Sequence, residues 1–377
     1  MRIVLTSGHK ADWDAGASSV YLNLHQQLGS LNHDTSIHHY DRYGASGAVG
    51  RLAGLVDPLL LDRVLYDEVK QADVVDVTGG LGWKLFDRLG REAGGRAPLR
   101  VCHLHGLEFK DDQARMMEEA SQLLKTPLLY RLFGRHLRNW HEFRAIRNAD
   151  LVICHSSREA DAIQVAGLKG ENQIAVVPLG VDSGPVKPRD FTVAAIRILW
   201  WGSWTERKGR AYLPRTLELI AREVPEVTLT IGGCSSEKAS ILRAFGPAMA
   251  SRVEVLPFVS RAQQSDIMDE HDVFLFPSIS EGFGLALLEA MSRGMPCVTT
   301  YTGMYDWLEH GRNCCVVPMQ APSATARQIV TLLRSPALRS ALSAEAIETA
   351  HALTWRNFAE GVAQAYALHL ERRTGRC

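Results

Sequence analysis

The stretch VFLFPSISEGFGLALLEA, residues 273–290, decides the fold predicted from this sequence. Residues 273–276 have the composition of a buried strand, and a loop with two glycines leads from them into an apolar helix that starts near Gly284. Strands followed directly by helices form parallel sheets, which bind ligands beyond the carboxyl ends of their strands. The stretch therefore predicts a parallel α/β sheet with a binding loop after residue 276.

The same alternation runs through both halves of the chain and predicts two domains. Strands are expected at 2–6, 74–77, 100–105, 151–155 and 174–178, and then at 196–202, 227–232, 253–258, 273–276, 296–299 and 315–317. Residues 183–195 contain two prolines and no helical period, as expected of a linker. We expect an α/β protein with two Rossmann-like, doubly wound domains, residues 1–182 and 196–353, that face each other across a cleft.

Two helices can be placed from local signals. Ser156 is followed three residues later by Glu159, a capping box that opens a helix after the strand at 151–155. The carboxyl-terminal helix, residues 354–377, should pack back on a domain through an apolar stripe at helical spacing. The members of that stripe are Trp355, Phe358, Val362, Tyr366 and Leu368.

Composition and charge exclude several classes of protein. The 377 residues are 46% hydrophobic and 22% charged, which is typical of a folded globular chain. Lys plus Arg and Asp plus Glu both number 42, so no overall field favours nucleic acid or an anionic membrane. The seven scattered cysteines form no CxxC pair, which predicts reduced thiols rather than disulfides or a zinc site. No signal peptide and no run of about 18 apolar residues is evident, so we expect a cytoplasmic protein.

Two carboxylates mark the binding loop and the helix that follows it. Glu281 lies in the loop and Glu289 in the helix, and both can accept hydrogen bonds from sugar hydroxyls. The free amides at the start of the helix suit a phosphate or a sugar hydroxyl. The alternative is that Glu281 only caps the helix and that Glu289 is a surface residue.

Other predicted strand ends carry further candidates. Arg207 and Lys208 can bind a diphosphate, or they are a solvated charge pair. His105 can bond a sugar hydroxyl, although a single histidine at a strand end is more often structural.

The loop after the first predicted strand spans residues 8–19 and includes Asp12, Asp14 and Gly16. The loop binds an anion, or it only connects the first strand to the following helix. It lacks the GxGxxG pattern, which argues against a nicotinamide-dependent dehydrogenase.

Taken together and in this order, these elements resemble the retaining GT-B glycosyltransferases of the large bacterial family four, whose donors are nucleotide diphosphate sugars. The resemblance runs nearly from end to end. It rests on Gly16, His105-Gly106, Ala149-Asp150 leading to Ser156, Val177 through Asp182, Lys208-Gly209, Gly232-Gly233, Pro277-Ser278, Glu281 through Glu289, Glu309 through Asn313, and Trp355.

The resemblance implies a role for each candidate. His105, Glu281 and Lys208 are implied as catalytic residues, with Lys208 on the diphosphate and the other two on the transferred sugar. Gly16 and Arg207 are implied as further donor-binding residues. The backbone near Phe258 and Val259 is implied to hold the base, and Glu289 the ribose. The amides of Phe283, Gly284 and Leu285 are implied to bind the sugar. In such enzymes the acceptor attacks from the face that the nucleotide leaves, and the protein supplies positioning and charge stabilisation.

The sequence departs from the family pattern at four positions. Ser203 stands where an arginine usually precedes the phosphate lysine, and Arg207 is our candidate to replace it. Leu179, Asp306 and Cys314 also differ from the usual Asn, Glu and Gly, which leaves details of the hinge and sugar pocket open.

Residues 130–147 are basic and amphipathic, with five arginines among Leu, Phe and Trp. Such a helix can lie on an anionic membrane, which would suit a lipid-linked acceptor and a place on the inner face of the membrane. The alternative is that the aromatic residues are core and that the arginines are solvated or bind an anionic acceptor.

We therefore expect a retaining hexosyltransferase that acts on a glycan, lipid-linked or small-molecule acceptor in polysaccharide biosynthesis. UDP donors are favoured over GDP-mannose only because they are more frequent in such enzymes. No cofactor or metal is expected, because Lys208 and helix amides can hold the diphosphate. A GT-B nucleotide-sugar epimerase and a degenerate, non-catalytic GT-B binding protein are the alternatives.

Overall fold

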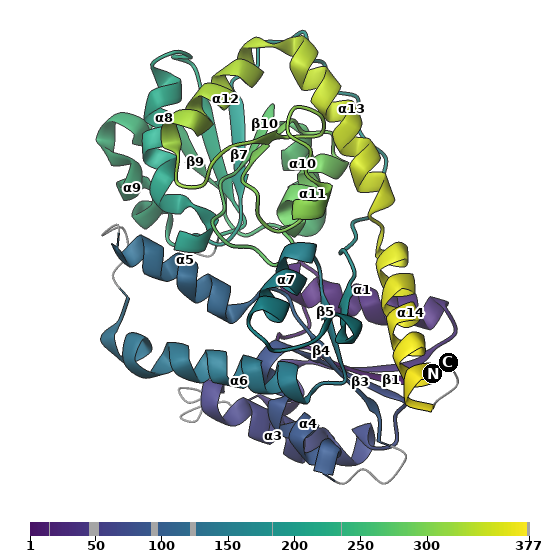
Figure 1. Cartoon of the computed structure of the whole chain (residues 1–377). Helices are drawn as coiled ribbons and strands as arrows, with labels where there is room; N and C mark the ends of the chain where they lie inside the picture. Colours follow the sequence, from purple (N-terminus) through teal and green to yellow (C-terminus); the bar gives the residue numbers. More distant parts are fainter. Residues whose placement is uncertain are drawn as a thin grey trace. The chain divides into compact units, whose positions relative to one another are not determined.

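The computed structural model describes residues 1–14, 16–44, 53–91, 97–120, 126–182, 184–234 and 236–374 (Figure 1). The chain divides into two compact units. The first consists of Met1–Asp112, Thr126–Leu179 and Trp355–Cys377, and the second of Gln113–Lys125 and Gly180–Thr354. Each unit is built on a six-stranded sheet in which all pairings are parallel.

The sheet of the first unit has the strand order β2-β1-β3-β4-β5-β6. Its strands are β1 (Arg2–Thr6), β2 (Asp34–His38), β3 (Val74–Thr78), β4 (Leu99–His103), β5 (Leu151–Cys154) and β6 (Ile174–Val176). The sequence predicted all of them except β2. That strand lies at the edge of the sheet and is only partly buried, so its sequence DTSIH carries no apolar run.

Helices cover both faces of this sheet (Figure 1). In chain order they are α1 (Gly16–Ser30), α2 (Tyr40–Tyr43), α3 (Ala53–Val69), α4 (Trp83–Arg91), α6 (Arg135–Asn148) and α7 (Ser157–Val165). A further helix, α5 (Glu108–Ala120), begins in the first unit and continues in the second from Gln113. Side chains of alternate strand residues point to opposite faces. Val75 and Val77 therefore join the apolar cluster formed with α3, α4 and α6, while Asp76 points to the face with α1.

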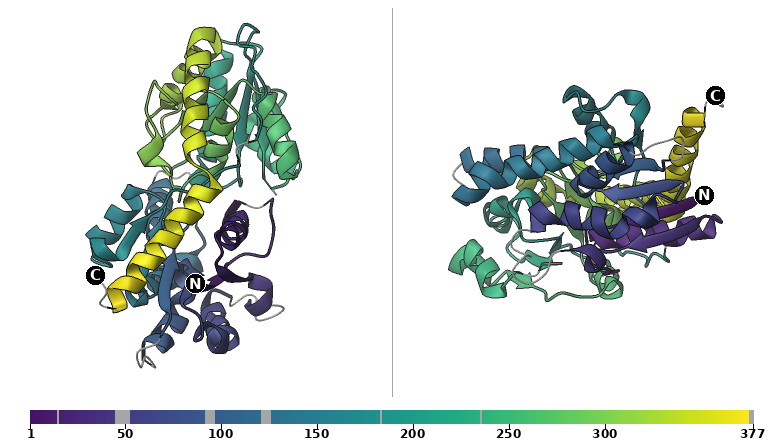
Figure 2. Two further views of the ribbon diagram at one scale, coloured as in Figure 1. Left: turned by 90° about the vertical axis from the view of Figure 1, so that its right-hand side faces the viewer. Right: turned by 90° about the horizontal axis from the view of Figure 1, so that it is seen from below.

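The carboxyl-terminal helix α14 (Trp355–Thr374) packs against α1, β4 and β5 (Figure 2). Four of its five predicted stripe residues are buried, whereas Leu368 is exposed, which corrects that part of the prediction. Leu368 follows Tyr366 by only two residues, which is about 200° around the helix axis, so its side chain points away from the packed face.

Ser156 caps α7 as predicted, because its side chain accepts a hydrogen bond from the backbone N–H of Glu159. The carboxylate of Glu159 bonds the backbone N–H of His155. It thus ties the helix to the end of β5.

The second unit is also built on a parallel six-stranded sheet, but its strand order is β12-β11-β10-β7-β8-β9, so its first strand lies between its second and its fourth. Its strands, all six of them predicted, are β7 (Arg197–Trp201), β8 (Thr228–Gly232), β9 (Val253–Val255), β10 (Val273–Phe276), β11 (Cys297–Thr299) and β12 (Cys315–Val316). Its helices are α8 (Leu213–Ala221), α9 (Lys238–Ala250), α10 (Arg261–Asp269), α11 (Leu285–Ser292), α12 (Pro322–Arg334) and α13 (Pro336–Ala352). The main apolar core lies between the sheet and α8, α9 and α12.

Candidate active site

A lysine and a glutamate meet beyond the ends of two neighbouring strands of the second unit. Lys208 closes a short 3₁₀ turn after β7, and Glu281 lies in the loop after β10. Lys208 Nζ is 2.7 Å from Glu281 Oε1, and the two side chains are 12% and 5% exposed. The alternative of a solvated charge pair is therefore wrong for Lys208.

A glycine lets these two loops approach each other. Gly209 has a φ of +74°, and a Cβ atom there would lie 2.2 Å from the carbonyl oxygen of Pro277. The backbone N–H of Ile279 donates to the carbonyl oxygen of Arg207 at 2.7 Å. The glycine after the lysine thus serves close backbone packing, which holds Lys208 against the loop of Glu281.

Arg207 reaches the same loop but stays more exposed than Lys208. Its Nη1 donates to the carbonyl oxygen of Ser280 and to Glu281 Oε2, both at 3.3 Å. Burial alone would raise the pKa of Glu281, but the cations of Lys208 and Arg207 outweigh it and hold that pKa below its ordinary value of 4.5. Glu281 is therefore ionised at neutral pH.

Glu289 on α11 is held by two residues of α10. Its Oε2 accepts a hydrogen bond from Gln264 Nε2 at 2.7 Å, and its Oε1 lies 3.2 Å from Arg261 Nη2. Arg261 also lies 3.7 Å from Asp182. Burial raises the pKa of Glu289, and Arg261 and Gln264 offset this only in part. The alternative of a plain surface residue is wrong for Glu289.

Sequence analysis did not single out Arg261 or Gln264. The signal that could have found them is the helix start at Ser260, where Ser260 and Gln263 form a full capping box. That helix follows directly on the candidate base-binding residues, of which Phe258 is 60% exposed and Val259 partly buried.

The start of α11 is shaped by Gly284, which has a φ of +90° and precedes the first helical residue, Leu285. Phe283 is buried beside Gly303, where a Cβ atom would lie 2.1 Å from the carbonyl oxygen of Phe283. The backbone before the helix is therefore fixed by close packing. The amides of residues 283–285 lie where the sequence placed them, at a helix amino terminus.

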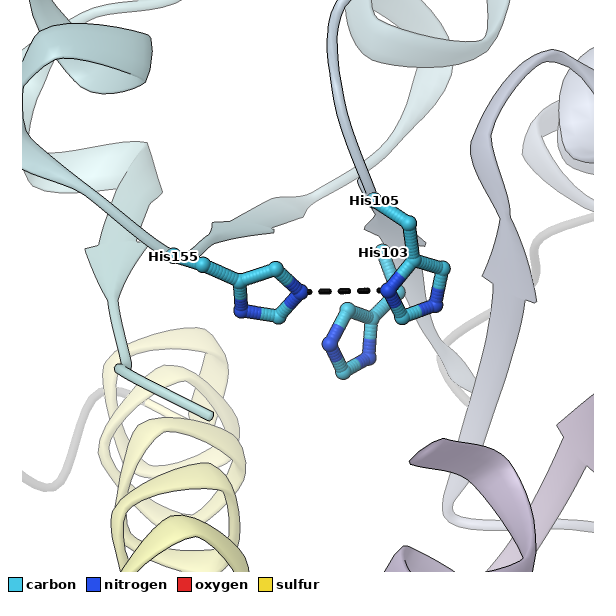
Figure 3. A group of neighbouring side chains, drawn as sticks. All are labelled: His103, His105 and His155. Atoms are coloured by element: carbon cyan, nitrogen blue, oxygen red, sulfur yellow. Dashed lines mark hydrogen bonds between the residues drawn. The ribbon is translucent and has the colours of Figure 1, made fainter. Parts of the chain in front are cut away.

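In the first unit His105 is one of three neighbouring histidines rather than a lone one (Figure 3). It follows β4, and its Nδ1 lies 3.2 Å from Nε2 of His155, which follows β5. Its ring also stacks on that of His103. Burial, and then the neighbouring imidazoles, lower the pKa of His105 well below 6.5, and that of His155 to about 3. Both rings are therefore neutral at pH 7.

A buried carboxylate lies under this group of rings. Asp76 Oδ2 is 2.9 Å from His103 Nδ1, and Asp76 Oδ1 accepts a 2.8 Å hydrogen bond from the Tyr21 hydroxyl. The Tyr366 hydroxyl of α14 also donates to Asp76. This network joins β3, β4, α1 and α14.

Sequence analysis missed His103, His155 and Asp76, although the strand register could have indicated them. His103 pairs with Ile153 across β4 and β5, so the positions two residues further along, His105 and His155, fall side by side.

Gly16 is the exposed first residue of α1. The loop before it is organised by its own side chains, because Ser18 Oγ accepts from the N–H of Asp12 and the N–H of Asp14 donates to Asp12 Oδ1. The loop is thus a folded turn, and its predicted role in anion binding stays a prediction.

Residues 130–147 form a π-helical turn, Tyr130–Gly134, and then α6. Apolar side chains that are 45–74% exposed cluster in and just before this segment: Leu128, Leu129, Leu132, Phe133 and Trp140. The alternative that the aromatic residues are all core is therefore wrong, although Phe143 does pack against the core of the first unit. Two of the arginines pair with carboxylates, Arg138 with Glu108 and Arg144 with Asp87.

Two family profiles match consecutive parts of the chain. The one described as "Glycosyltransferase Family 4" matches residues 15–184, and the one described as "Glycosyl transferases group 1" matches residues 195–335. The chain belongs to family four of the GT-B glycosyltransferases.

Similar proteins agree with this membership. The chain resembles D-inositol 3-phosphate glycosyltransferases, with 26% identity to that of Rhodococcus jostii (60% of this chain, 54% of the relative) and 29% to that of Xylanimonas cellulosilytica (62% and 61%). The match thus spans little more than half the length of these relatives.

Among solved structures, sucrose-phosphate synthase from Thermosynechococcus elongatus has a TM-score of 0.78 at 19% identity, and the match covers 97% of this chain and 98% of that one. HepE of Anabaena in complex with UDP has a TM-score of 0.69 at 16% identity, over 97% and 100% of the two chains. This likeness confirms the predicted GT-B fold.

The structure also bears on the expectations about membrane-spanning segments and cysteines. Among the described residues, no helix is both long and apolar enough to cross a bilayer. The six cysteines that fall among them are free and buried, as predicted, and Cys377 lies outside the described residues.

Proposed function

We propose that this chain transfers a hexose from a nucleotide diphosphate sugar to an acceptor, with retention of the anomeric configuration. The observation that carries the proposal is the buried pair of Lys208 and Glu281 beside the start of α11. A cation and helix amides at one strand end suit a diphosphate, and a carboxylate beside them suits sugar hydroxyls. The site residues of the second unit thus form one donor-binding group.

Each residue has a distinct task in this proposal. Lys208 neutralises the charge that develops on the leaving diphosphate, with Arg207 in support. Glu281 and the amides of residues 283–285 orient the sugar, and Glu289 binds the ribose hydroxyls. The exposed Phe258 ring and the backbone beside it receive the base. In the first unit, His105 is the group assigned to the transferred sugar.

The acceptor proton passes to the leaving diphosphate oxygen, so the protein needs no nucleophile of its own. Catalysis then rests on positioning and on electrostatic stabilisation of the leaving group. The proposal needs neither a cofactor nor a metal ion for transfer, and it favours UDP over GDP as the nucleotide.

A ligand screen by thermal unfolding tests the donor. A ligand at 100 times its Kd stabilises the folded state by about 2.7 kcal/mol. We expect stabilisation by one nucleoside diphosphate and its sugar conjugates among UDP, GDP, ADP and NAD. Glu289→Ala should abolish it, whereas Glu348→Ala, at an exposed position of α13, should not. A folded protein that responds to none of these ligands would contradict the proposal and favour a non-catalytic binding protein.

We also propose that the exposed apolar surface of Leu128, Leu129, Leu132, Phe133 and Trp140 rests on an anionic membrane, next to a lipid-linked acceptor. Leu129 and Phe133 are 74% and 68% exposed, and arginines are interleaved with them. Apolar side chains that insert at the interface and nearby cations that attract anionic lipids act together in such helices.

Co-sedimentation with vesicles tests this contact. The protein should pellet with anionic vesicles and remain in solution with neutral ones. The double substitution Leu132→Ser and Phe133→Ser should prevent pelleting, and Val165→Ser, at an exposed position of α7, should not. Failure of the wild-type protein to pellet with anionic vesicles would remove the membrane from the proposal.

A further inference from the structure

The three histidines of the first unit, His103, His105 and His155, are arranged as a set of metal ligands. Each ring offers one nitrogen, and these three nitrogens all lie within 4.8 Å of one another. The rings come from the ends of β4 and β5, and the His103 ring lies beside the contact between His105 and His155 (Figure 3). We call this group the three-histidine cluster.

Two of the rings are held from behind, as in metal centres. His103 Nδ1 lies 2.9 Å from a carboxylate oxygen of Asp76, and His155 Nδ1 lies 2.9 Å from the carbonyl oxygen of Val177. Carboxylates and carbonyl groups of this kind fix the tautomer and the orientation of metal-binding histidines. Both rings thereby keep a proton on Nδ1 and turn the lone pair of Nε2 inward.

A hydrogen bond between neutral rings explains only part of this arrangement. It accounts for the contact between His105 and His155. It leaves two buried ring nitrogens, Nε2 of the fully buried His103 and Nε2 of His105, with no hydrogen-bond partner within the described part of the chain. A buried nitrogen without a partner costs free energy unless a ligand meets its lone pair.

One pair of ring nitrogens has the spacing that a small tetrahedral ion requires, and the third nitrogen lies within 4.8 Å of both. A tetrahedral zinc ion with Zn–N bonds of about 2.0–2.1 Å separates its ligand nitrogens by about 3.3 Å. His105 Nδ1 and His155 Nε2 lie 3.2 Å apart. Nitrogen ligands exclude Mg²⁺ and Ca²⁺ and favour zinc and its neighbours in the first transition series.

We propose that the three-histidine cluster binds one divalent transition-metal ion of the zinc class, through Nε2 of His103, Nδ1 of His105 and Nε2 of His155. All three rings bind as neutral imidazoles, because the proton on His105 can reside on Nε2. Asp76 supplies the compensating negative charge behind His103.

The site has a consequence for catalysis that rests on the proposed function. His105 is the residue of the first unit assigned to the transferred sugar, and a bound metal ion occupies its ring nitrogen. Metal binding should therefore inhibit transfer, and a chelator should restore it. The ion would act as an inhibitor of a reaction that does not require it.

Cobalt(II) is the probe, because tetrahedral cobalt absorbs visible light strongly. Untagged, chelator-treated full-length protein should bind one equivalent and give a tetrahedral spectrum without a thiolate charge-transfer band. His105→Ala should weaken cobalt binding by about 100-fold. Loss of a residue that only supports a metal ligand already weakens binding by about 10–100-fold, and His105 is a ligand itself. His351→Ala, at an exposed position of α13, should bind as the wild type does.

Failure of the wild-type protein to bind cobalt, or equal binding by His105→Ala and wild type, would overturn the site. If His105→Ala does not fold, NMR of the wild-type histidine nitrogens decides instead, since zinc must then shift three rings and no others. Both experiments measure metal binding without nucleotide, so their results do not depend on the proposed function. A protein that binds cobalt but no nucleotide keeps the metal site and loses the proposed function, and the reverse result removes the site alone.

Discussion

The two units build sites of opposite electrostatic character on parallel six-stranded sheets whose strand orders differ. Beyond β7 and β10 of the second unit, two carboxylates are each matched with cations: Glu281 with Lys208 and Arg207, and Glu289 with Arg261. Beyond β4 and β5 of the first unit, neutral imidazoles gather above one buried carboxylate. In both units polar groups meet where neighbouring parallel strands end, and the residues at the strand ends decide what they bind.

This difference suggests that the two units bind different kinds of ligand. Mobile or partly exposed cations can exchange a carboxylate partner for a phosphate, so the second unit suits a charged donor. The group in the first unit is anchored by the Tyr21 and Tyr366 hydroxyls on Asp76, so it suits ligands that need a fixed lone pair. Substitutions on the two sides should accordingly affect different measurements.

The largest effect is expected for Lys208→Ala. Removal of one positioned charge from a transition state costs about 10²–10³-fold in kcat, or about 2.7–4 kcal/mol. Turnover of the nucleotide sugar identified by the screen measures it. Lys238→Ala, at an exposed position of α9, serves as the control. Turnover close to wild type in a folded Lys208→Ala protein would mean that the charged pair is structural.

Tyr366→Phe should act on stability instead. The hydroxyl donates to the Asp76 carboxylate, and hydrogen bonds to charged groups contribute about 1.5–3 kcal/mol. We expect the free energy of unfolding in urea to fall by about 2 kcal/mol. Tyr43→Phe removes a 2.6 Å bond to the neutral carbonyl of Ser7 and should cost about 1 kcal/mol. Equal losses would mean that the bond to Asp76 contributes no more than a bond to a backbone carbonyl.

Arg207→Ala should lower turnover by about tenfold, or about 1.4 kcal/mol. Arg207 contacts Glu281 but is 40% exposed, so solvent screens its charge more than that of Lys208. Arg207→Lys should recover part of the loss by retaining the charge. Near wild-type turnover in Arg207→Ala would end the idea that Arg207 replaces the arginine missing at Ser203.

Sequence reasoning found the central residues of the donor group but not their partners. Lys208, Glu281 and Glu289 each follow a strand, which local pattern reveals. The partners Gln264 and Arg261 lie on another helix, so only the folded chain brings them to Glu289. Fold prediction failed in the same way at β2, an edge strand whose pairing, rather than its composition, makes it a strand.

The three-histidine cluster shows the same limit in the first unit. His105 was recognised at its strand end, but its neighbours His103 and His155 depend on the register between β4 and β5. Register follows from packing and loop lengths, which a single sequence does not specify. Contacts along one segment were therefore predictable, and contacts across strands were not.

The smallest effect is expected for the pH dependence of stability. We compare the melting temperatures of Glu281→Gln and Glu289→Gln, which test the donor group alone. The pKa of Glu281 is lowered in the folded state, so its ionised form stabilises the protein above the ordinary value of 4.5, and this is lost as pH falls through the folded pKa. The pKa of Glu289 is raised, so its contribution is complete below 4.5 and is lost as pH rises through the folded pKa.

The two variants should therefore differ in stability at pH 7, with only Glu281→Gln destabilised. Glu281→Gln leaves the Lys208 cation buried without its carboxylate and should lower the melting temperature. Glu289→Gln removes a carboxylate that burial disfavours and should leave the melting temperature unchanged or raise it. Both differences from wild type should shrink toward about pH 4, where carboxyl groups take up protons. Parallel curves for the two variants would mean that the surroundings do not distinguish the two carboxylates, and the opposite directions of their pKa shifts would be wrong.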